Sequence, residues 1–208
     1  MRLAVLLIIT ALFLATLAAP TIAAKKSLES FNIQIYDSRI KKWISMHDAH
    51  VAMGEVNMVF VGEIHNHNVG HMIEYQLLSN YYFNTTSIGI KHFALSLEMF
   101  ERDVQTLLSG YLSDQMTRGF FLGNSRPWPN YETDYQPMVE FIHKSKNNST
   151  VLAANIPRRY AALVAAGNES VLWEMPVVER SYVAPAIDAP HDEYYKIFYA
   201  MFKKGMLH

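Results

Sequence analysis

The chain has 208 residues, of which 50% are hydrophobic and 18% charged, and its formal net charge is −1. This balance excludes a disordered tail, and near-neutrality provides no electrostatic drive toward nucleic acid or an anionic membrane surface. The length predicts one domain with at most a short appendage. Because the chain has no cysteine, thiolate zinc sites, iron–sulfur clusters and cysteine nucleophiles are excluded. Any metal or haem must be held by His, Tyr, Met, Asp or Glu.

Residues 1–24 have the pattern of a secretory signal peptide. One basic residue precedes a mostly apolar run, which ends at Pro20 and a stretch of small residues. The alternative is an uncleaved membrane anchor, but the run lies at the short end of the roughly 17–25 residues that span a bilayer. We expect cleavage after Ala23 or Ala24. Residues 25–208 would then form a secreted domain without a membrane span.

Four N-glycosylation sequons follow, beginning at Asn84, Asn147, Asn148 and Asn168. Each is a surface-loop signal in a host that glycosylates its exported proteins. Together with the signal pattern, they favour an exported glycoprotein.

The rest of the chain alternates between the hydrophobic periods of strands and helices. Strands are predicted at residues 31–36, 56–62, 93–99 and 150–155. Amphipathic helical patterns follow the last three of these strands, and a short helix is predicted at residues 43–53. Strands that are apolar on both faces and alternate with such helices predict an α/β fold, with a mostly parallel sheet covered by helices on both faces.

Two further segments are distinctive. Residues 117–134 are rich in Gly, Pro, Asn and aromatic residues and predict a long irregular loop, a length typical of binding loops. Near the end of the chain Tyr195, Phe198, Tyr199 and Phe202 recur at helical spacing. That aromatic stripe indicates a core or interface helix.

Polar residues follow three of the predicted strands, where a parallel sheet binds its ligands. Because these strand ends share one edge of the sheet, we expect the side chains to converge on one pocket. They are Glu63, His65, His67 and His71 after the second strand, Glu98 at the end of the third, and Asn155, Arg158 and Arg159 after the fourth.

Each of these groups also has an ordinary structural explanation. Glu63 and His65 could cap the following helix, although three histidines within seven residues together with Glu63 form dense ligand chemistry for a cap. The i,i+4 spacing of His67 and His71 places both on one helix face, where they could equally face solvent. Arg158 and Arg159 could be a solvated helix start, but cations there oppose the helix dipole and favour an anionic partner, either a carboxylate of the site or an acidic ligand.

Two phenols lie in the aromatic stretch of residues 128–135. Tyr131 and Tyr135 suit either stacking on a flat ligand or ligation of iron through a phenolate. The alternative is a well-packed loop.

Several phrases of the sequence, in order, carry a family resemblance. They are Val-Gly-Glu-Ile-His at residues 61–65, Leu-Glu-Met-Phe-Glu-Arg at 97–102, Trp-Pro-Asn-Tyr at 128–131, Asp-Tyr-Gln-Pro at 134–137 and Ala-Ala-Asn-Ile-Pro-Arg-Arg at 153–159. From about Phe31 onward the chain resembles the ChaN-type branch of the haem-binding uptake and Tiki-like superfamily. The resemblance implies an exported α/β protein that binds haem in connection with iron acquisition, with a haem site that a homodimer can share.

The resemblance also supplies an alternative and a departure. More distant relatives are hydrolases that use a Gly-x-x-His motif with acidic partners, which corresponds here to Gly62–His65 with Glu63 and Glu98. Longer members of the family continue into a further strand with another Gly-x-x-His, whereas this chain stops at His208. We therefore expect a domain that lacks its C-terminal part or is completed by a partner, and we favour haem binding over hydrolysis.

The haem hypothesis assigns the axial ligand to Tyr131, Tyr135 or His65. Arg158 or Arg159 would pair with the propionates, and Asn155 would lie beside them.

The hydrolase hypothesis makes Glu63 or Glu98 the general base. A divalent metal would be held by His65, His71 and Glu63, and an arginine would stabilise the oxyanion. A third hypothesis is an inactive exported domain that associates through its aromatic helix.

Overall fold

The structure is a computed structural model that describes residues 31–203 except 88, 90, 91, 146–148, 168 and 186–189. The predicted signal peptide and the sequons at Asn147, Asn148 and Asn168 lie outside the described residues. The chain divides into two compact units, Met1–Asn155 and Ile156–His208, and each is described by itself. Among the described residues, no helix combines the length and the apolar character needed to cross a bilayer.

A parallel pair of strands forms the centre of the first unit. β3 (Phe93–Glu101) and β4 (Ser149–Asn155) pair with Leu97 opposite Ala153, and the register shifts before Glu101 meets Asn155. Both strands were predicted from sequence, and the parallel pairing confirms the α/β class. On β4, Val151 is fully buried whereas the next residue, Leu152, is 42% exposed. This alternation places the core on one face of the strand pair.

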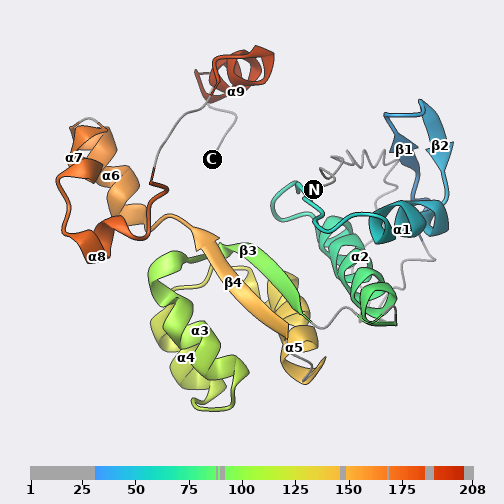
Figure 1. Cartoon of the computed structure of the whole chain (residues 1–208), viewed down its shortest axis with the longest axis horizontal. Coiled ribbons are helices and arrows are strands. Elements are labelled where there is room, and N and C mark those ends of the chain that lie inside the picture. The colour runs from blue at the N-terminus through green and yellow to red at the C-terminus, as the bar shows by residue number, and fades with distance from the viewer. Residues whose placement is uncertain are drawn as a thin grey trace, which may run out of the picture. The chain divides into compact units, whose positions relative to one another are not determined.

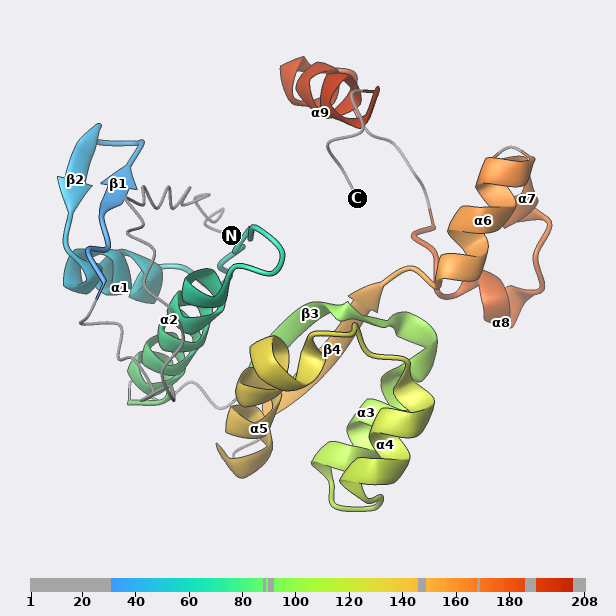
Figure 2. The same cartoon turned by 180° about the vertical axis from the view of Figure 1, so that it is seen from behind.

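Helices cover that core face, as Figures 1 and 2 show from opposite sides. Leu108, Phe121 and Val139 are fully buried in a cluster that also includes Val151. The covering elements are η2 (Arg102–Val104), α3 (Gln105–Leu112), α4 (Arg118–Ser125), η3 (Tyr131–Tyr135) and α5 (Gln136–Ser145).

The side chain of Gln105 completes the hydrogen bonding of β4. Its Nε2 donates to the carbonyl of Val151 at 3.0 Å, and its Oε1 accepts from the backbone N–H of Ala153 at 2.7 Å. The primary amide thus makes the pair of bonds that a neighbouring strand would make.

The prediction of an irregular loop at residues 117–134 is wrong in part. Thr117 accepts a hydrogen bond from the backbone N–H of Phe120 and caps α4, while η3 is a π-helical turn leading into α5. The segment is polar and rich in glycine, which is typical of a loop, yet part of it forms a capped helix whose Phe121 is fully buried.

The first elements also differ from the prediction. β1 (Ile35–Asp37) and β2 (Lys42–Ile44) form an antiparallel hairpin, and α1 (Met46–Gly54) follows. Trp43 therefore lies in a strand and not in the expected helix. A capping box between Ser45 and Asp48 fixes the helix start after that strand.

The predicted buried strand at residues 56–62 is not observed. The segment has no strand pairing among the described residues, and Met58 and Phe60 are 58% and 61% exposed. A strand requires a neighbour for its backbone groups, and β3 and β4 pair with each other alone in the described part of the chain. The helix after it, α2 (Asn68–Ser87), agrees with the predicted helical pattern.

The second unit consists of helices. Tyr160, Leu172 and Val183 form its small core. Its elements are α6 (Arg158–Ala166), α7 (Ser170–Trp173), α8 (Val177–Arg180) and α9 (Glu193–Lys203). The predicted aromatic stripe lies on α9, where Phe198 and Tyr199 are each 47% exposed; the side chain of Phe202 is outside the described set.

Candidate functional site: a carboxylate and imidazole cluster before α2

The loop that leads into α2 brings Glu63 and His65 together. Oε1 of Glu63 lies 2.5 Å from Nδ1 of His65 and accepts a 2.6 Å hydrogen bond from the hydroxyl of Tyr135. The Glu63 side chain is only 12% exposed. Two contacts on one oxygen fix this carboxylate and leave Oε2 for the interior side.

His71, one turn into α2, lies behind this loop. Its side chain is 4% exposed, and its Nδ1 lies 3.1 Å from Oε2 of Glu74 and 3.4 Å from Oε2 of Glu63. On the other side of the ring, Nε2 is 3.4 Å from Oδ2 of Asp134 but has no hydrogen-bond partner in the part of the chain that the structure describes. One buried imidazole is therefore surrounded by three carboxylates.

Asn130 connects the loop to the π-helical turn. Its Nδ2 donates to Oδ2 of Asp134 at 2.7 Å and to Oδ1 of Asn66 at 3.3 Å. Asn66 has φ of 60°, a left-handed conformation that Asn tolerates better than most residues. The side chains of Asn130 and Tyr135 thus hold the loop at both ends.

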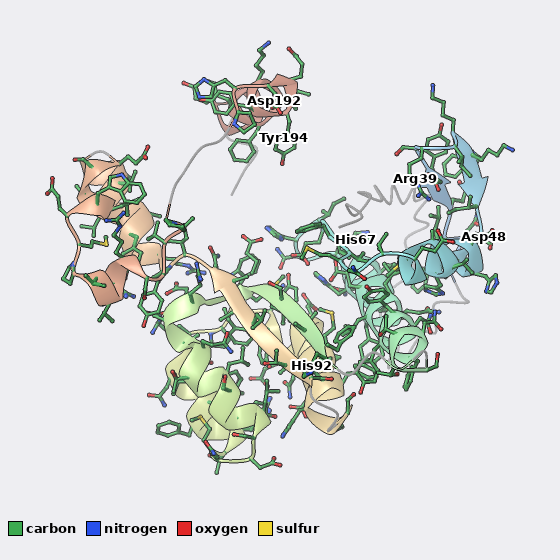
Figure 3. The ribbon with its side chains drawn as sticks, in the orientation of Figure 1. Arg39, Asp48, His67, His92, Asp192 and Tyr194 are labelled. Carbon is green, nitrogen blue, oxygen red and sulfur yellow. The ribbon has the colours of Figure 1, made fainter. Side chains whose placement is uncertain are left out.

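His67 has a structural role. Its Nδ1 accepts a 3.0 Å hydrogen bond from the backbone N–H of Gly70 and caps the start of α2. Figure 3 shows this residue where the loop enters the helix. The sequence predicts that His67 and His71 share one helix face. In the structure His67 caps the helix, whereas His71 belongs to the cluster.

Aromatic rings enclose the two clustered imidazoles. The His65 ring meets Trp128 edge to face at 5.0 Å, and the His71 ring meets Tyr135 in the same way at 4.9 Å. The His65 side chain is 46% exposed, and its Nε2 has no hydrogen-bond partner among the described residues. His65 is thus half-exposed, whereas Glu63 and His71 are largely covered.

Burial shifts two of the titrating groups. It raises the pKa of Glu74, an effect that the bond to His71 opposes. It also raises the pKa of Tyr135 far above the ordinary value for a phenol, and the hydrogen bond to Glu63 adds to the shift. Tyr135 is therefore a neutral phenol that donates to a carboxylate.

Sequence reasoning missed Glu74, Asn130 and Asp134. Glu74 could have been found from its spacing, because it is three residues after His71 on the same helix face. Asn130 and Asp134 lie in two of the phrases that carry the family resemblance, but their residue types alone indicated no role, since only the tertiary packing of η3 against α2 brings them to the site.

Other predicted residues of the first unit lie apart from these contacts. Tyr131 is 2% exposed and packs against Phe100 at a ring distance of 5.2 Å, so its ring is part of the core. Glu98 is an exposed residue of β3 and has no hydrogen bond or ion pair in the described part of the chain. Asn155 lies opposite Glu101 at the end of the strand pair.

Arg158 and Arg159 begin α6 in the second unit. The Arg159 guanidinium pairs with Glu179 at 2.8 Å and lies over the ring of Tyr160. Its carboxylate partner is therefore on α8, and the assignment of the two arginines to the site stays a prediction.

Comparison with known proteins identifies the family of this chain. The family described as "Haem-binding uptake, Tiki superfamily, ChaN" matches residues 51–208, a range that contains the whole cluster. The chain belongs to this family. The expected ChaN-type identity is thereby confirmed, and no curated protein matches.

This chain has a fold similar to that of a solved ChaN structure. That structure is described as "Cofacial heme binding to ChaN of Campylobacter jejuni", and it matches with a TM-score of 0.61 and 16% identity. The match covers 84% of this chain and 64% of the solved one. The present chain thus spans slightly less than two thirds of that ChaN protein.

Proposed function

We propose that this chain is an exported haem-binding protein that serves haem or iron uptake, with His65 as the axial ligand of the iron. The observation that carries the assignment of His65 is its bond to Glu63. Because Nδ1 faces the carboxylate at 2.5 Å, Nε2 is the ring nitrogen directed to a ligand. A carboxylate behind a ligating imidazole orients the ring and raises its basicity.

The donor set favours His65 over the two phenols. Tyr131 is 2% exposed and Tyr135 is fully buried, and burial raises the pKa of each phenol. A phenolate ligand requires the opposite shift and an accessible oxygen. His65 has a half-exposed ring whose Nε2 is accessible.

The surroundings of His65 suit a flat apolar cofactor. Trp128 provides an aromatic edge beside the imidazole, and Phe60 and Ile64 nearby in the chain are 61% and 76% exposed. Bound haem would supply a redox-active iron and a wide apolar face, and these side chains would give that face a surface to cover. Asn155, Arg158 and Arg159 are the proposed partners of the propionates, and a homodimer is the proposed assembly.

A haem titration tests the axial ligand. The wild-type protein should develop a Soret band distinct from that of free haem. His65→Ala should weaken haem binding at least about tenfold or change the ligation spectrum, as expected when a ligand is removed. His47→Ala is the matched control, because His47 is exposed on α1. Equal spectra and affinities for His65→Ala and wild type would overturn the assignment of His65.

Export and uptake have their own tests. The mature protein recovered from an exporting host should begin at Ala24 or Lys25, and a species that retains Met1 would contradict cleavage. Deletion of the gene should impair growth when haem is the iron source. Unchanged growth would separate haem binding from uptake.

A further inference from the structure

We propose that Oε2 of Glu63, Nδ1 of His71 and Oε2 of Glu74 form a binding site for one divalent transition-metal ion. This site goes beyond the proposed haem function. It shares Glu63 with the haem proposal but uses neither His65 nor the outer face of the loop.

The three donor atoms have the spacing that a metal ion requires. One ligand atom from each of Glu63, His71 and Glu74 lies within 4.8 Å of the other two, and Nδ1 of His71 is 3.1 Å from Oε2 of Glu74 and 3.4 Å from Oε2 of Glu63. An ion about 2.0–2.2 Å from each N or O donor separates neighbouring donors by roughly 3–3.5 Å. The donors thus need little movement to close on an ion.

The carboxylates of the cluster favour the binding of a cation. The side chains of Glu63, Glu74 and Asp134 are only 10–12% exposed. Within the described part of the chain, none of the three pairs with a lysine or an arginine. Buried carboxylates are stable when they are paired, protonated or bound to a metal.

The far side of the His71 ring provides an independent indication. Nε2 is buried, has no hydrogen-bond partner among the described residues, and faces Oδ2 of Asp134 at 3.4 Å. When Nδ1 ligates a metal, Nε2 carries the proton and can donate it to a carboxylate, which is the usual support of a metal-bound imidazole. Asn130 already holds that carboxylate through a 2.7 Å hydrogen bond.

The donor chemistry selects the class of ion. One imidazole and two carboxylates suit Zn²⁺ or Mn²⁺, whereas Mg²⁺ and Ca²⁺ prefer oxygen alone. Zn²⁺ should bind more tightly than Mn²⁺. His65, which sequence analysis placed among the metal ligands, is engaged with the other oxygen of Glu63 and is not part of the three-donor group.

Calorimetric titration of the chelator-treated protein with Zn²⁺ and Mn²⁺ tests the site. The wild type should bind one ion per chain. Glu74→Gln should weaken Zn²⁺ binding at least tenfold, and Asp134→Asn about 10–100-fold, because it removes the outer partner of the ligand. Glu132→Gln is the matched control, since Glu132 lies on the same turn but is 66% exposed and pairs with Arg118. Equal Zn²⁺ affinity for wild type and Glu74→Gln overturns the proposal.

A measurement on the wild type alone keeps the proposal falsifiable if a variant fails to fold. Pulsed electron paramagnetic resonance of the Cu²⁺-loaded protein should detect one ligating imidazole, and a spectrum without imidazole overturns the site. Two variants distinguish a failure of the haem proposal from a failure of the metal proposal. Glu74→Gln should lose Zn²⁺ binding and keep the Soret band, whereas His65→Ala should do the reverse.

Discussion

The hydroxyl of Tyr135 and the carboxylate of Glu63, 72 positions apart in sequence, are joined by a 2.6 Å hydrogen bond. The bond ties the loop before α2 to the π-helical turn before α5. Tyr135→Phe should therefore destabilise the protein by about 1.5–3 kcal/mol, the range for a hydrogen bond to a charged group. Urea unfolding measures this difference.

The same variant separates the candidate axial ligands. Tyr135→Phe should retain the haem Soret band, because His65 keeps its nitrogen free. Tyr75→Phe serves as the control for removal of a phenol, since Tyr75 is 38% exposed and its hydroxyl has no hydrogen bond among the described residues. Loss of the Soret band in Tyr135→Phe alone would move the axial ligand to Tyr135.

Trp128 should report haem binding. Its ring is 5.0 Å from that of His65, so haem bound at His65 should quench its fluorescence strongly. The chain has three tryptophans, and Trp128→Phe should remove the most strongly quenched component while Trp173→Phe leaves it. Quenching that is unaffected by Trp128→Phe would place haem elsewhere.

Gln105 lies on α3, but its side chain should stabilise the β3–β4 strand pair. Gln105→Ala leaves the Val151 carbonyl and the Ala153 N–H without their side-chain partner and should cost about 1–3 kcal/mol. Hydrogen exchange of the Ala153 amide should accelerate. The exposed Gln115 offers a control, and Gln115→Ala should stay within about 0.5 kcal/mol of wild type. Unaltered exchange at Ala153 in Gln105→Ala would contradict this role.

The core of the first unit predicts a contrast between two leucines. Leu108 is fully buried, and Leu108→Ala should cost about 2–5 kcal/mol through lost contacts and a cavity. Leu152 is 42% exposed on the other face of β4, so Leu152→Ala should cost much less. Thermal or urea unfolding compares them, and equal losses would mean that the outer face of β4 is covered.

Asp37 should stabilise the β1–β2 hairpin in a pH-dependent way. Hydrogen bonds from Arg39 lower the pKa of this carboxyl to about 2. A folded-state pKa below the unfolded value gives stability that is present above about pH 4 and lost as the pH falls toward 2. An NMR titration of Asp37 should show this low midpoint, and Arg39→Ala should return it toward 4. An ordinary midpoint in the wild type would rule out the interaction.

Local sequence predicted those parts of the fold whose signals are local. β3 and β4 are apolar runs of strand length, and α2, α3 and α6 carry helical patterns, so their type could be inferred. The run at residues 56–62 has the same composition as a buried strand, yet no described strand pairs with it. Pairing is a tertiary property, which explains why this prediction failed while those for β3 and β4 held.

The candidate site shows the same division. Glu63, His65 and His71 could be selected because their chemistry is concentrated within nine residues. Asp134 and Asn130 could not, because they reach the cluster through the packing of a π-helical turn that no sequence period indicated. Whether Glu98, Asn155, Arg158 and Arg159 join the same site remains a prediction for haem titration of their variants.

The amide of Gln105 has a consequence for how the sheet can grow. It occupies the Val151 carbonyl and the Ala153 N–H, so another strand could bond to these two groups of β4 only by displacing the glutamine. A single side chain on a neighbouring helix thus protects two backbone groups of the strand pair from pairing with another chain.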